Sequence, residues 1–159
     1  MISSRVPSTP GILSENGIIH LPRLHQKASL ARNAMLDDEY DACGQGFDQM
    51  VLNGLGIDRE EFMAHINGGQ PTLVDTERWI LAKRGGAKLS LTEETKLNSS
   101  IKDYEHDEAI RITILKAACI TDDCSIRDAV TLNEIDDRTC FSMKLQEHSE
   151  KPAQASVSA

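Results

Sequence analysis

The spacing of the hydrophobic residues predicts that this chain folds mainly as short α-helices. Leu21, Leu24, Ala28, Ala31 and Met35 follow one another at intervals of three and four, which places them on one face of a helix. Pro22 lies where the first helical turn tolerates a proline. Acidic residues begin after position 36 and would oppose the partial negative charge of a helix end, so we expect this helix to stop near Met35.

Further helices are predicted by helix-capping pairs, in which a polar residue is followed three positions later by an acid. The pairs are Asp58 and Glu61, Thr72 and Asp75, and Ser90 and Glu93. A short helix precedes them, with Phe47, Met50, Val51 and Leu55 on one face, and Gly54 and Gly56 are candidates for its end. The middle of the chain is therefore expected to be all helical.

The last third of the chain has a less regular pattern. Asp107 to Cys119 alternates partly as a strand would, but its length and the acids at its start favour a helix. We expect Asp128 to cap a last short helix that runs through Ile135. The acidic pair Asp136–Asp137 is interpreted as turn or capping residues.

Together these patterns predict a mainly α fold, as a compact single domain of about six or seven short helices. The 159 residues are enough to bury about 70% of the unfolded surface. Residues 1–20 are expected to form an extended N-terminal arm with Ile18 and Ile19 at its end, and residues 21–144 the helical domain. Residues 145–159 have low hydrophobicity and are expected to be a disordered C-terminal tail.

Composition narrows the classes of partner. A net charge of −8, a pI near 5.1 and 4% aromatic residues argue against binding to nucleic acid or to an anionic membrane surface. No apolar run approaches the roughly 20 residues of a membrane span, and no signal peptide is evident, so we expect a cytoplasmic, acidic protein. A homo-oligomer is left open.

Cysteine and histidine spacing gives no sign of a disulfide framework or a metal site, and the sequence has no P-loop or G-x-G-x-x-G motif that would indicate a nucleotide cofactor. The four cysteines, Cys43, Cys119, Cys124 and Cys140, contain no C-x-x-C pair and are interpreted as reduced thiols. The five histidines are scattered and none lies at a recognised zinc-ligand spacing.

Candidate chemistry concentrates between Leu21 and Gly54. Arg23 and Lys27 are four residues apart on the predicted helix, so they project from one face and could bind a carboxylate or phosphate. The alternative is a solvated basic face that pairs with the acids between Asp37 and Asp41. His25 lies on the other side of the helix, where a hydrogen-bonded polar side chain is the simpler interpretation.

Three side chains in the segment that follows this helix could act together with the two cations. Tyr40, Cys43 and Asp48 offer a proton donor, a nucleophile and an orienting acceptor if the fold brings them near Lys27. Each also has an ordinary role: a buried ring, a small apolar filler, and a cap at a helix N-terminus. We take Lys27, Tyr40, Cys43 and Asp48 as candidate catalytic residues, and Arg23 and Lys27 as candidate ligand-binding residues.

Several of these segments resemble a family of short bacterial proteins classed as a domain of unknown function. The segments are LPRLHQKASLA, EYDACGQGFD with Tyr40, Cys43 and Asp48, LGIDREEF, and DTERWILAK with Trp79. The similarity extends loosely to about Asp137. Two positions depart from the family pattern: Ser29 replaces an arginine, and the interval from Cys43 to Asp48 is two residues longer. The resemblance implies a location for the site, with Trp79 as a further ligand-binding residue, and no reaction.

Two hypotheses of function follow from the sequence. The first is a small soluble helical protein with a pocket for a small anionic or carbonyl-containing molecule, with acid–base turnover as an open question. The second is a non-catalytic helical adaptor or regulatory protein that binds another protein through an amphipathic surface.

Overall fold

The computed structural model describes residues 8–122 and 125–150. Within these ranges it contains seven helices and no strand. The helices are α1 (Leu21–Arg32), α2 (Phe47–Leu55), α3 (Arg59–Gly69), α4 (Leu73–Lys83), α5 (Leu91–Lys102), α6 (Glu108–Ala117) and α7 (Ala129–Glu150). The prediction of a compact, mainly α fold with about six or seven helices is confirmed, including the helix expected after Asp107.

Local capping chemistry fixes most of the helix boundaries. The Asp58 side chain accepts hydrogen bonds from two backbone N–H groups at the start of α3. Reciprocal capping boxes begin α4 and α5 at Thr72 and Ser90, and α2 ends at Gly56, whose φ is 68°. Helix α1 ends three residues before the predicted Met35, because the chain turns away through Ala34 at a φ of 54°.

The main hydrophobic core lies among the first five helices and includes the start of α7. Fully buried side chains come from α1, α2, α3, α4 and α5; among them are Leu24, Leu52, Phe62, Ile80 and Ile101. Ala129 and Val130 of α7 belong to the same core. Helix α3 packs against α1, and α5 packs against both α2 and α7. The beginning of α7 is therefore anchored in the five-helix body.

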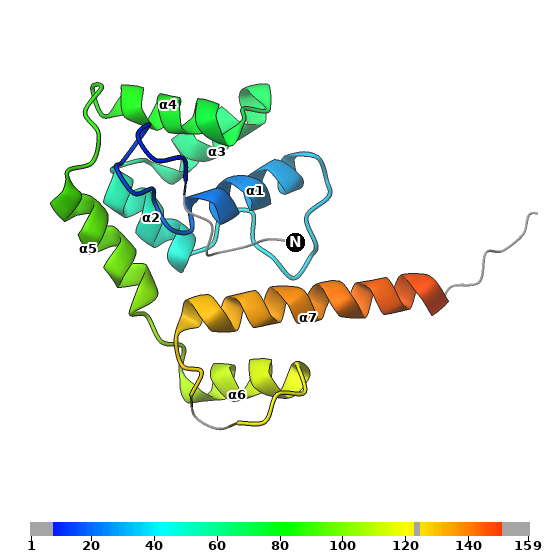
Figure 1. The fold of residues 1–159 in the computed structure, drawn as a ribbon. Helices are drawn as coiled ribbons and strands as arrows, with labels where there is room; N and C mark the ends of the chain where they lie inside the picture. The colour runs from blue at the N-terminus through cyan, green and yellow to red at the C-terminus, as the bar shows by residue number, and fades with distance from the viewer. Residues whose placement is uncertain (1–7, 123–124, 151–159) are drawn as a thin grey trace, which may run out of the picture.

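Helices α6 and α7 form a hairpin beside this body (Figure 1). A second, smaller apolar cluster lies between them, formed by Ile114, Leu115 and Leu132. The buried Arg111 guanidinium donates to Glu108 and Asp122, which ties the hairpin loop to α6. The part of the chain that the structure describes thus has two apolar clusters, and α7 contributes to both.

Residues 8–20 pack on the body through a series of turns. Leu13 and Ile18 are fully buried, and the Leu13 carbonyl accepts a hydrogen bond from the Leu89 N–H. Glu94 of α5 accepts hydrogen bonds from the backbone N–H groups of Glu15 and Asn16. These contacts bring the chain into α1 at a fixed position.

Helix α7 differs most from the prediction. Asp128 does cap it, since the Thr131 N–H donates to the Asp128 carboxylate, but the helix continues to Glu150 instead of ending near Ile135. The expected disorder is therefore wrong for residues 145–150, while 151–159 lie outside the described residues. Residues 143–147 are Met, Lys, Leu, Gln and Glu, which have high helix propensity, and this outweighs their low average hydrophobicity.

The structure also describes the state of the cysteines and the lengths of the apolar helices. Cys43, Cys119 and Cys140 are free thiols, and Cys124 lies outside the described residues. Across residues 8–122 and 125–150, no helix combines the length and apolar character that crossing a bilayer requires.

Candidate functional site

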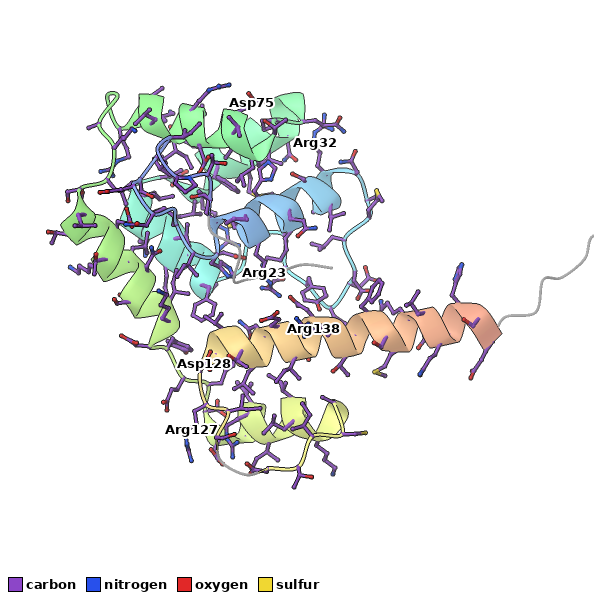
Figure 2. The ribbon with its side chains drawn as sticks, in the orientation of Figure 1. Arg23, Arg32, Asp75, Arg127, Asp128 and Arg138 are labelled. Atoms are coloured by element: carbon purple, nitrogen blue, oxygen red, sulfur yellow. The ribbon has the colours of Figure 1, made fainter. Side chains whose placement is uncertain are left out.

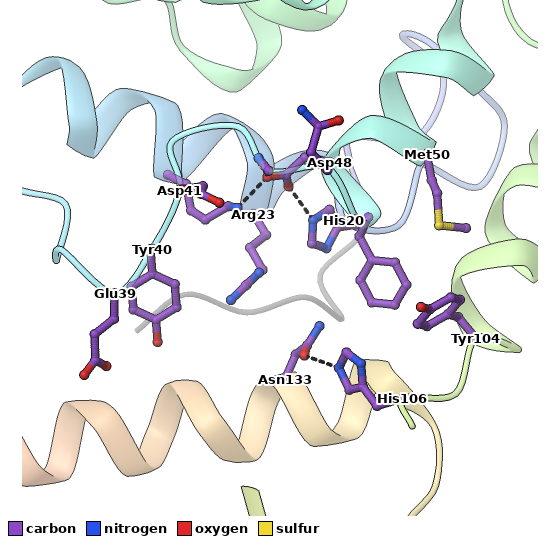
Figure 3. Close-up of a pocket in the computed structure, with 15 residues that line it drawn as sticks. His20, Arg23, Glu39, Tyr40, Asp41, Asp48, Met50, Tyr104, His106 and Asn133 are labelled. Atoms are coloured by element: carbon purple, nitrogen blue, oxygen red, sulfur yellow. Dashed lines mark hydrogen bonds and ion pairs between the residues drawn. The ribbon is translucent and has the colours of Figure 1, made fainter. Parts of the chain in front are cut away.

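A cavity of about 410 Å³ lies where α1, α2 and α7 approach one another (Figure 3). Its buried wall carries His20, Arg23, Lys27, Phe47 and Asp48. The connector between α1 and α2 forms a second side, and the linker between α5 and α6 forms a third. The cavity therefore lies between the five-helix body and the α6–α7 hairpin.

Asp48 is the centre of the polar network in the buried wall. Its Oδ1 lies 2.7 Å from His20 Nε2, and its Oδ2 accepts hydrogen bonds from Lys27 Nζ at 2.5 Å and from the Gly44 N–H at 2.6 Å. Burial alone would raise the pKa of Asp48, but the hydrogen bond from His20 and the positive charge of Lys27 outweigh it and lower the pKa to about 2. Asp48 is thus a carboxylate whose hydrogen-bonding capacity is largely used.

A second buried ion pair connects α1 to α7. Arg23 donates from Nη2 to Asp137 Oδ1 at 2.7 Å and from Nε to Asp137 Oδ2 at 3.2 Å. Figure 2 shows Arg23 directed from α1 towards α7. The Tyr40 hydroxyl donates to the same Oδ1 at 3.0 Å. Asp137 therefore holds together α1, the connector and α7.

His20 belongs to the site although the sequence analysis did not select it. It precedes α1 as the N-cap residue, with a φ of 72°, and its ring is buried edge-on against Phe47 at 5.2 Å between centroids. Burial lowers the pKa of His20, with the Asp48 contact opposing, so the neutral ring donates from Nε2. Its buried Nδ1 has no partner among the described residues. A sequence signal was present, because His20 interrupts the apolar run formed by Ile18, Ile19 and Leu21.

Aromatic rings and an amide line the side of the cavity opposite the connector. Phe47 and Tyr104 meet edge to face at 5.5 Å, and Tyr104 meets His106 in the same way at 6.0 Å. His106 Nε2 lies 2.8 Å from the Asn133 side-chain oxygen (Figure 3). This side combines apolar surface with polar groups of α7 and of the linker between α5 and α6.

The structure brings together most of the residues that the sequence analysis selected. Arg23, Lys27, Tyr40 and Asp48 all line the cavity. Cys43 is buried behind it, and burial is the main cause that raises the pKa of its thiol, which disfavours the nucleophilic thiolate. The expected placement of Trp79 in the site is wrong, since Trp79 lies on α4 and stacks on His65 at 4.3 Å, outside the residues that line the cavity.

Other interpretations made from the sequence need correction. The cations of α1 do not form a solvated face paired with the connector acids, because both are buried and pair with Asp48 and Asp137. Asp137 is a buried residue inside α7, so it is neither a turn nor a capping residue. Asp48 lies within α2 and binds Gly44 instead of capping the helix. His25 hydrogen-bonds the Pro71 carbonyl, as its separate face suggested.

The described residues contain no group of three or more His, Cys, Asp or Glu side chains that could hold a metal ion. The site as it stands offers hydrogen-bond donors and acceptors, two ion pairs and aromatic surface.

Comparisons of the chain with protein-family models, with curated proteins and with solved structures gave no match. The resemblance to a family of short bacterial proteins therefore stays a prediction, and the geometry of the cavity carries the functional argument.

Proposed function

We propose that the cavity binds a small molecule that presents a carbonyl group to Arg23 and Lys27. The supporting observation is that two buried cations lie in its wall, each already paired with one carboxylate. Taking ion pairs out of water is costly, and well-packed apolar residues often stabilise a fold equally well. A ligand that uses these groups explains their presence better than stability does.

Both cations keep donors that have no acceptor among the described residues. The Arg23 bonds to Asp137 occupy Nε and Nη2, and no acceptor for Nη1 is found among the described residues. Lys27 has three N–H donors, of which one is directed to Asp48. A carbonyl oxygen at this wall would receive hydrogen bonds from groups that the ion pairs hold in place.

Charge balance favours a neutral carbonyl or a single carboxylate over a multiply charged anion. Asp137 and Asp48 neutralise Arg23 and Lys27, and the exposed acids Glu39 and Asp41 add negative charge at the open edge. A phosphate monoester would meet this negative charge without a free cation to offset it. The aromatic side offers surface to an apolar or ring-shaped portion of the ligand.

Acid–base turnover by the candidate catalytic residues has less support than binding. Burial and the Asp137 carboxylate raise the pKa of Tyr40, and the pKa of Asp48 is about 2. Effective proton transfer at neutral pH needs groups with a pKa near 7. The proposal is therefore a binding pocket, in which Tyr40 and Asp48 position the two cations.

A thermal-shift screen tests the proposal with four compound classes: ketones, amides, monocarboxylates and phosphate monoesters. We expect carbonyl compounds to raise the melting temperature, by about 5–10 °C at one hundred times the dissociation constant. Arg23→Lys keeps a cation beside Asp137 but lacks the planar guanidinium fork, and it should abolish most of this shift. Arg32→Lys is the matched control, because Arg32 is exposed at the far end of α1.

Two results would contradict the proposal. One is that no ketone, amide or monocarboxylate changes the melting temperature of the wild-type protein. The other is an equal shift in Arg23→Lys and in wild type, which would place the ligand elsewhere. Circular dichroism of both variants establishes beforehand that they are folded.

A further inference from the structure

A second cavity, separate from the pocket above, opens between the end of α1 and the middle of α7. Its volume is about 260 Å³, and its apolar lining comes from Leu30 of α1, Met35 and Leu36 of the connector, and Phe141 of α7. Tyr40 lies between the two cavities and lines both. We call this second cavity, with its four apolar lining residues, the α1–α7 groove.

Large apolar side chains in the groove, and one next to it on α7, are exposed to solvent. Met35 is 71% exposed and Phe141 is 47% exposed. Leu145 is 54% exposed and follows Phe141 by one helical turn, so the two share a face of α7. Figure 1 shows the C-terminal half of α7 extending beyond the other helices. An exposed apolar surface of this kind is typical of a binding surface for another chain.

Acidic residues are neighbours of the groove residues along the chain. Asp38, Glu39 and Asp41 follow Met35 and Leu36 along the connector, and Asp136 precedes the groove residues of α7; all four are exposed. None of the four forms an ion pair with another described residue. The one cation in the lining, Lys144, pairs with Asp37. The groove therefore has an apolar floor, and the acids next to it along the chain are exposed and form no ion pair with a described residue.

We propose that the α1–α7 groove docks a basic amphipathic helix of another protein. The apolar face of such a helix would contact Met35 and Phe141, and its lysines or arginines would lie against the connector acids. The opposite charge would also speed association with a chain whose net charge is −8. This surface shares Tyr40 and the connector acids Glu39 and Asp41 with the edge of the small-molecule pocket, whereas its four apolar residues line the groove alone.

Two other occupants match the groove less well. A second copy of the chain carries the same net charge of −8 and the same acidic edge, so the two copies repel at this surface. Residues 151–159, KPAQASVSA, contain no apolar side chain larger than valine, and they offer little to fill a groove lined by leucine, methionine and phenylalanine.

Fluorescence anisotropy with the full-length protein tests the proposal. The probe is a labelled peptide of about 14 residues, roughly 20 Å long when helical, with leucine on one face and lysine on the other. The matched peptide has glutamate in place of every lysine. We expect the lysine peptide to bind about tenfold more tightly or better, and to weaken as the salt concentration rises.

Paired variants decide whether binding occurs in the groove. Met35→Ser with Phe141→Ser removes the two anchors and should weaken binding of the lysine peptide by about tenfold or more. Ile110→Ser with Ile112→Ser is the control, because these α6 side chains are 44% and 45% exposed and lie outside the groove. The control variant should bind as wild type does.

Three results would overturn the proposal. The first is equal binding of the lysine peptide by the groove variant and the control, which indicates non-specific attraction to an acidic protein. The second is that sedimentation detects a dimer of the wild-type protein and a monomer of Phe141→Ser, which would mean that a second copy of the chain occupies the groove. The third is tighter peptide binding by a variant that ends at Glu150, which gives the groove to residues 151–159.

Discussion

Asp48→Asn tests the buried network on which the candidate site depends. In wild type the carboxylate binds Lys27, His20 and the Gly44 N–H at distances of 2.5–2.7 Å. An amide has nearly the same shape but no charge, so the variant leaves the buried Lys27 ammonium without its counter-charge. Removing one partner of a buried ion pair costs about 3–5 kcal/mol, a large part of the roughly 5–15 kcal/mol that stabilises a typical domain. We expect a loss of this size at pH 7.

The same substitution also changes how stability depends on pH. The pKa of Asp48 is lowered from 3.8 to about 2 on folding, so the unfolded chain binds a proton more readily below pH 4. Stability from this group is present above pH 4 and is lost as the pH falls towards 2. At about 1.36 kcal/mol for each pH unit, the contribution is on the order of 2 kcal/mol. Asp48→Asn should lack this part of the acid-induced loss.

Urea unfolding followed by circular dichroism at pH 7 and at several values down to pH 2.5 measures both effects. Asp38→Asn is the control, because Asp38 is exposed and forms no ion pair with a described residue. Lys27→Met combined with Asp48→Asn removes both charges and should recover part of the loss. The reasoning is refuted if Asp48→Asn is as stable as Asp38→Asn at pH 7, or if it loses as much stability in acid as wild type.

Further predictions concern packing, burial and thiol reactivity. A Cβ added at Gly54 would lie 2.7 Å from a side-chain carbon of α5, so Gly54→Ala should destabilise the protein by about 1–3 kcal/mol; Gly68→Ala, which meets nothing within 4 Å, should stabilise it by up to about 1 kcal/mol in urea unfolding. Burial raises the pKa of Glu77 above 4.5, so the stability that the protonated side chain allows is lost as the pH rises above 4.5. The free energy of unfolding of Glu77→Gln should therefore increase relative to that of wild type between pH 4 and pH 7. A difference in urea unfolding that stays constant over this pH range would contradict the prediction. Mass spectrometry after iodoacetamide treatment of the folded protein should show the exposed Cys119 labelled well before the buried Cys43, and equal rates would mean that Cys43 is accessible.

Features encoded by neighbouring residues could be predicted from the sequence. The capping boxes at Thr72 and Ser90 use a donor and an acceptor three residues apart, so the start of each helix follows from local chemistry. The length of α7 could not be predicted in the same way. The hydrophobic pattern weakens after Ile135, and helix propensity with the contacts near the helix start keeps the chain helical to Glu150.

The two cations of the candidate site could be predicted from the sequence, but their partners could not. Helical spacing placed Arg23 and Lys27 on one face, and the structure agrees. Their partners depend on the tertiary fold, because Asp137 is 114 residues from Arg23. In the sequence, the pair Asp136–Asp137 is typical of an ordinary turn. His20 entered the site through a backbone conformation with positive φ, which no local pattern of side chains required.

Nuclear magnetic resonance of the arginine side chains tests the central claim most directly. The Nε–Hε resonance of Arg23 reports on the guanidinium that the proposed carbonyl ligand contacts. During titration with the most stabilising ketone, amide or monocarboxylate, we predict a saturable shift of the Arg23 resonance, with the resonance of the exposed Arg32 unchanged. A compound that stabilises the protein while leaving the Arg23 resonance in place would contradict the account.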